Sequence, residues 1–173
     1  MTIDEAVAEF AAALDAKTPV LVSEIRRVIV DCPFNLDSGV LKTSVDGIHF
    51  EYDWSTFTPV ACPLNTSTGY CGSSEALSLL SEYETELLPP SLEEDVLQSV
   101  PESERQAAQD KLDAIITEVY CDWFANSWKL ARNARPRMRG FLSVHDTIWR
   151  TDLDTGEEFR EDLGPIKFFP RRV

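Results

Sequence analysis

The residue best suited to nucleophilic chemistry is Cys71, which stands in the segment Gly69-Tyr70-Cys71-Gly72-Ser73. The residues after this segment are expected to form a helix, and the backbone donors and dipole at a helix start lower the pKa of a thiol. A cysteine nucleophile also needs a base, which His49 or His145 would supply, with Asp146 to orient the imidazole. No catalytic signature surrounds Cys71, so an unreactive loop thiol is the more frequent explanation of this pattern.

Paired carboxylates form a second candidate group. In the predicted strand Ile48–Trp54 the residue types alternate, which indicates one covered apolar face and one solvated acidic face. Ile48, Phe50, Tyr52 and Trp54 share the first face, and His49, Glu51 and Asp53 share the second. Carboxylate pairs are so frequent that proximity in sequence alone does not indicate hydrolysis or metal binding. The strand also interleaves acids with aromatic residues, a combination that suits recognition of a basic protein.

The acidic residues are concentrated in the middle of the chain. The net charge is −14, and residues 43–104 hold twelve acids and no Lys or Arg. Such a surface argues against binding to nucleic acid or anionic membranes, which select basic proteins. The basic residues Lys129, Arg132, Arg135, Arg137 and Arg139 form one cluster, which we interpret as a counter-charge to the acidic middle or as an interface rim.

The hydrophobic patterning predicts one α+β domain over residues 1–173. Helices are expected at about 2–15, 75–88, 91–100 and 101–133, and strands at about 20–30, 40–43, 48–54, 141–145, 147–152 and 157–160. Residues 165–169 are expected to form a short edge strand or a C-terminal clamp. Residues 55–74 are rich in turn formers and are expected to be a loop. The predicted sheet is largely antiparallel and packs against the long helix from about Pro101 to Asn133.

The cysteine spacing and the first residues bear on cofactors and location. Cys32, Cys62, Cys71 and Cys121 match no zinc template, so we expect no metal and no other cofactor. The first residues carry no basic or apolar leader, and no apolar run reaches the length of a membrane span. We therefore expect a cytoplasmic protein with reduced thiols and no membrane partner.

These observations leave three classes of function. The favoured class is a small acidic protein, not an enzyme, that neutralises a basic protein partner, most of all an immunity- or antitoxin-type inhibitor of a bacterial toxin. The alternatives are a hydrolase that uses Cys71 with His49 or His145, and an adaptor or structural subunit. The predicted contacts with the basic partner are Glu51, Asp53, Glu82, Glu84 and Glu86.

Overall fold

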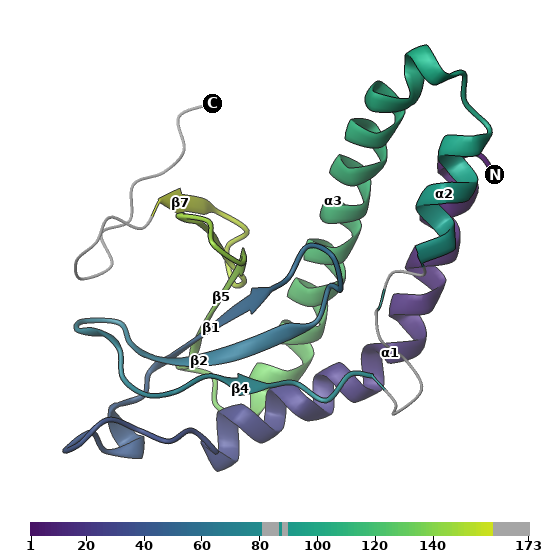
Figure 1. Ribbon diagram of the computed structural model, residues 1–173. Helices are drawn as coiled ribbons and strands as arrows, with labels where there is room; N and C mark the ends of the chain where they lie inside the picture. Colours follow the sequence, from purple (N-terminus) through teal and green to yellow (C-terminus); the bar gives the residue numbers. More distant parts are fainter. Residues whose placement is uncertain (81–86, 88–89, 161–173) are drawn as a thin grey trace.

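The computed structural model describes residues 1–80, 87 and 90–160 (Figure 1). The α-helices are α1 (Ile3–Asp31), α2 (Pro90–Gln98) and α3 (Arg105–Ala131), with short 3₁₀ turns at Lys42–Ser44, Glu102–Glu104 and Arg132–Ala134. The strands are β1 (Gly47–Tyr52), β2 (Pro59–Asn65), β3 (Gly69–Tyr70), β4 (Glu75–Ala76), β5 (Arg139–Val144), β6 (Trp149–Asp152) and β7 (Glu158–Arg160). The α+β prediction is therefore confirmed.

The sheet is mixed, but most of its strand pairs are antiparallel. Its order is β3-β2-β1-β5-β6-β7, with β4 also paired to β2. Only β1 and β5 are parallel among the described strands. Their parallel register requires a long connection, which here contains β2 to β4 and the helices α2 and α3.

The first helix is longer than predicted. Thr2 and Glu5 form the expected capping box, but α1 continues through Pro19 to Asp31. The prediction of a strand at 20–30 is wrong, because Leu21, Ile25, Val28 and Ile29 bury one helical face, and this spacing outweighs the β-branched composition. Figure 1 shows that α1 bends between its two halves, as expected for a helix with an internal proline.

The first two strands also differ from the prediction. Residues 40–43 do not pair with β1; its antiparallel partner is β2, which comes from the segment expected to be a loop. Pro63 in β2 has no N–H to donate, and the outer edge of β2 is interrupted there, because β3 and β4 pair only with the residues on either side of it. Prolines in this segment therefore mark an interrupted strand.

The predicted helix at 75–88 is also wrong where the structure describes it. Glu75 and Ala76 form β4, and Leu77 and Leu79 are buried while Ser78 between them is exposed. This alternation is the period of an extended strand. The remainder of that predicted helix and the predicted strand at 165–169 fall mainly or wholly outside the described residues.

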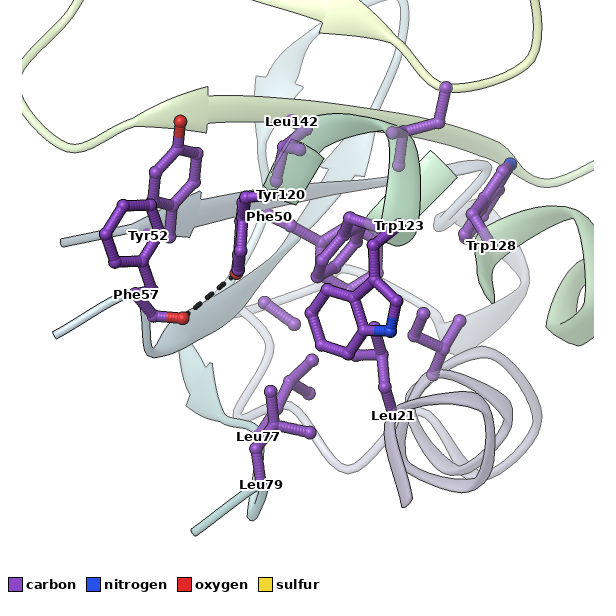
Figure 2. Close-up of a cluster of buried hydrophobic side chains, with 14 of the residues drawn as sticks. Leu21, Phe50, Tyr52, Phe57, Leu77, Leu79, Tyr120, Trp123, Trp128 and Leu142 are labelled. Carbon is purple, nitrogen blue, oxygen red and sulfur yellow. Dashed lines mark hydrogen bonds between the residues drawn. The ribbon is translucent and has the colours of Figure 1, made fainter. Parts of the chain in front are cut away.

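The predicted packing of the long helix on the sheet is confirmed (Figure 2). Phe50 of β1 lies 5.0 Å from Phe124 of α3, between ring centroids, and Tyr52 lies 4.5 Å from Tyr120. The Tyr120 hydroxyl donates a hydrogen bond of 3.0 Å to the Phe57 carbonyl, which joins the helix to the turn after β1. None of the described helices is long and apolar enough to cross a membrane.

Candidate functional site

The parallel pairing of β1 and β5 brings two polar segments to one edge of the sheet. Tyr52 and Val144 are in register at the carboxyl ends of the two strands, and the His145 N–H donates to the Tyr52 carbonyl at 2.8 Å. The residues that follow both strands therefore leave the sheet side by side. We call this edge the acid–aromatic rim; it consists of Glu51, Asp53, Trp54, His145, Asp146, Ile148 and Trp149.

Glu51 lies between two imidazole rings. One carboxylate oxygen is 3.7 Å from Nδ1 of His49, and the other is 3.6 Å from Nδ1 of His145. The Glu51 side chain is 25% exposed, so only part of it is reached from solvent. Glu51 thus lies at the boundary between the buried centre of the sheet and the rim.

Asp53 is exposed, and its carboxylate also organises the turn after β1. Its Oδ1 atom accepts hydrogen bonds from the backbone of Ser55 at 2.8 Å and of Thr56 at 3.3 Å, and from the Ser55 hydroxyl. These hydrogen bonds, that of the Ser55 hydroxyl first, lower the pKa of Asp53 below its ordinary value. The second carboxylate oxygen makes none of these bonds and can accept from a partner.

The segments that follow β1 and β5 also expose large apolar side chains. Trp54 is 37% exposed, Ile148 48% and Trp149 37%. Trp54 packs on the buried ring of Phe57, with 5.3 Å between the ring centroids. The prediction had assigned Trp54 to the covered face together with Tyr52, and only Tyr52 is buried.

The loop between β5 and β6 holds the other half of the rim. Asp146 has a positive φ of 61°, and its side chain is 89% exposed. The Thr147 hydroxyl lies within hydrogen-bond distance of the Val144 and Trp149 carbonyls, at 3.0 and 3.1 Å, which ties the loop to its own ends. His145 is more than half exposed and lies 3.5 Å from the Asp146 carboxylate.

His49 is fully buried, contrary to the predicted solvated face. Its Nδ1 lies 2.6 Å from the Tyr70 hydroxyl and its Nε2 lies 2.8 Å from the Ser143 hydroxyl. Arg150 donates to the same Tyr70 oxygen at 2.7 Å. Side chains from β3, β5 and β6 therefore cover this face of β1, which the alternation within one strand cannot reveal.

The protonation of His49 follows from its neighbours. Burial, and then the positive charge of Arg150, hold the pKa of His49 well below its ordinary value, so the ring is neutral at pH 7. Because a guanidinium only donates, the Tyr70 oxygen accepts from Arg150 and can donate its own proton to Nδ1. The Nε2–H group then donates to Ser143. A buried neutral imidazole in this arrangement links three strands and is closed to a substrate.

Cys71 lies apart from both histidines. Its side chain belongs to the hydrophobic core, with Cys32 and Phe34, whereas the preceding Tyr70 is directed to His49. Burial, and then the negative charge of Asp37, raise the pKa of Cys71. The expectation of a lowered pKa is wrong, because β4 and not a helix follows this loop. The pairing of Cys71 with His145 and Asp146 has no support in this geometry.

Two members of the basic cluster form ion pairs with acids close to them in the sequence. Arg132 pairs with Asp154, and Arg139 pairs with Asp152 at 2.7 Å, so these acids come from β6 and the turn after it. They do not come from the acidic middle of the sequence. Glu82, Glu84 and Glu86 lie outside the described residues. In the described part of the chain, no three His, Cys, Asp or Glu side chains gather closely enough to hold a metal.

Sequence reasoning named Glu51 and Asp53 as partner contacts and His145 and Asp146 as catalytic candidates, and the structure brings all four to one edge. It missed Ile148 and Trp149, whose only signal was their apolar type in an otherwise polar turn. Comparisons with family models, with curated proteins and with solved structures give no match to this chain.

Proposed function

We propose that this protein binds a basic protein partner through the acid–aromatic rim and blocks that partner's activity in one-to-one complexes. One observation carries the proposal: the parallel pairing of β1 and β5 gathers Glu51, Asp53 and Asp146 around His145, in segments that also expose Trp54, Ile148 and Trp149. Residues 51–58 and 144–149, which form this edge, include no Lys or Arg. Basic side chains of a partner would meet acids here without a competing base.

The rim combines the two features that give protein interfaces their affinity. Carboxylates accept charge-assisted hydrogen bonds from Arg and Lys, and tryptophan is among the residues that most often dominate binding energy. Asp53 and Trp54 are held by their turn and by Phe57, so little conformational entropy is lost when they bind. The net charge of −14 would add long-range attraction and speed the encounter.

The proposal also covers which class of inhibitor this protein is and where in the cell it acts. A small acidic chain that neutralises a basic enzyme suits an immunity- or antitoxin-type inhibitor of a bacterial toxin. The four cysteines are free thiols in the structure, and a reducing cytoplasm would keep them so. Glu82, Glu84 and Glu86 stay predicted contacts that supplement the rim.

The test is capture and inhibition with matched variants of the full chain. The wild type, a rim variant (E51Q/D53N/D146N) and a control variant (E94Q/D95N/E102Q) are immobilised and exposed to an extract of the source cells. Both variants lose three negative charges, and the control acids are exposed on α2 and the adjoining 3₁₀ turn. We expect a basic protein to be retained by the wild type and the control and to be lost from the rim variant.

The captured protein is then purified and its activity is titrated with the wild type. The proposal requires the activity to fall to its minimum near a one-to-one ratio, and association to slow steeply between about 50 and 500 mM salt because exposed charges are screened. Equal retention by both variants, or full activity of the partner in the saturated complex, would contradict it.

A further inference from the structure

A groove between α1 and α3 is separate from the rim and has the size of a small-molecule site. Its volume is about 400 Å³, which falls within the range of ligand pockets. Leu14 of α1 and Val119 and Trp123 of α3 give it an apolar wall. Trp123 is fixed in place, because its indole N–H donates to the Thr18 hydroxyl at 2.8 Å.

The charged side chains that line the groove are all negative. Asp15 of α1 and Asp122 of α3 both line it and are exposed, and no Lys or Arg lines it. Because Pro19 has no N–H, the backbone carbonyl of Asp15 also loses the donor that residue 19 would otherwise supply. The groove therefore carries negative charge that no Lys or Arg of its lining opposes.

A buried hydroxyl in the wall points independently to a ligand. Ser127 is 1% exposed and lines the groove, and its Oγ has no hydrogen-bond partner among the described residues. Buried polar atoms in native proteins are almost always hydrogen-bonded, so the Ser127 hydroxyl offers a hydrogen-bonding position to water or to a ligand in the groove. A hydroxyl can accept from an ammonium group as readily as from water.

We propose that this groove binds a small organic cation, a compound with an apolar body and one protonated amine. The apolar body would lie against Leu14, Val119 and Trp123, and the ammonium group would lie between Asp15 and Asp122. An anion would meet two carboxylates, and a neutral apolar compound would leave both carboxylates without a charged partner. The charge and the chemistry of the lining select the amine from these three classes.

The test uses 4-phenylbutylamine as the probe and 4-phenylbutan-1-ol as its neutral counterpart, with the full-length protein. Binding is followed by amide chemical shifts in NMR titrations at pH 7. We expect the amine to bind with a Kd on the order of 1 mM, as suits a ligand of this size, and the alcohol to bind more weakly. The shifts should be centred on residues 11–18 and 119–130.

Matched variants separate a specific site from general attraction to an acidic protein. The variant D15N/D122N removes the two groove carboxylates, and E9Q/E118Q removes two exposed acids of the same helices that do not line the groove. We expect about fivefold weaker amine binding in the first variant and unchanged binding in the second. Equal weakening in both, equal affinity for the alcohol, or shifts centred elsewhere would overturn the proposal.

Discussion

Gly140 of β5 lies directly against the indole ring of Trp128. A Cβ atom at position 140 would be 2.5 Å from Cε2 of that ring, a distance that carbon atoms do not tolerate. Trp128 is fully buried, and its indole N–H donates to Asp154 at 2.8 Å, so it has little freedom to move away. The close contact between α3 and β5 at this point therefore requires glycine at position 140.

The substitution Gly140→Ala should lower the free energy of unfolding by about 2 kcal/mol, because overpacking a core forces side chains out of place. Urea denaturation gives this value directly. In the background of Trp128→Phe, which leaves space beside position 140, the same substitution should cost clearly less. Additive effects of the two substitutions would show that the ring does not limit this site.

The buried imidazole of His49 makes stability depend on pH. Its pKa is lowered in the folded protein by burial and by Arg150, whereas in the unfolded chain it is near ~6.5. Below pH ~6.5 the unfolded state therefore binds a proton at His49 that the folded state does not bind. The stability that this group contributes above pH ~6.5 is lost as the pH falls towards the folded-state pKa. We expect a loss approaching about 1.4 kcal/mol per pH unit between pH 6 and 5 from this group.

Urea denaturation of the wild type and of His49→Gln at pH 7.5, 6 and 5 checks this prediction. Carboxylates contribute the same background to both proteins, so the difference between them isolates the imidazole. The variant His145→Gln is the matched control, because His145 is more than half exposed. An unchanged pH slope in His49→Gln would show that the ring is protonated in the folded protein.

The hydroxyl of Tyr120 should contribute measurably to stability. The residue is fully buried, and its hydroxyl donates a hydrogen bond to the Phe57 carbonyl. Tyr120→Phe leaves that carbonyl without this donor and should cost about 1–2 kcal/mol of unfolding free energy. Tyr52→Phe is the control and should cost less, since the Tyr52 hydroxyl makes a weak contact with the Cys121 sulfur at 3.9 Å. An equal loss of unfolding free energy in the two variants would show that the hydrogen bond from Tyr120 to Phe57 does not add to stability.

The thiol of Cys71 should be slow to react in the folded protein. It is buried, and its pKa is raised by burial and by Asp37, so little thiolate is present at neutral pH. Iodoacetamide labelling at pH 7.5, followed by peptide mass spectrometry, should modify Cys71 more slowly than a free cysteine in solution. Faster labelling of Cys71 than of free cysteine would contradict this prediction and would support the alternative of a Cys71-dependent hydrolase.

Sequence reasoning succeeded where one segment determines its own structure. The long helix predicted from about Pro101 to Asn133 is found as α3, where Leu112, Ile116 and Tyr120 are buried at helical spacing. Sequence reasoning failed for residues 20–30. Their β-branched composition favours a strand, but their apolar residues recur at helical spacing and are buried on one face of α1. Sequence reasoning failed again for β2, since prolines in an interrupted strand look like those of a loop.

Only the part of the acid–aromatic rim that lies on β1 and directly after it could be predicted from the sequence. Glu51 and Asp53 are visible as acids alternating with aromatic residues in one strand. Their juxtaposition with Asp146 depends on parallel pairing of β1 with β5, which no local pattern specifies. The burial of His49 likewise depends on Tyr70 and Arg150, which belong to strands on opposite sides of β1 in the sheet order.

The pairing of β1 with β5 also has a consequence for the order of folding. The paired residues, such as Gly47 and Arg139, are about ninety positions apart, and α3 lies between them. Closing so long a loop costs chain entropy before any contact compensates for it, and high contact order slows folding. On the ribosome, β1 must wait for α3 and β5 to be synthesised, so the rim first exists when translation has passed Trp149. A truncated chain that ends after α3 would display the acids of β1 but would lack the surface that they share with β5.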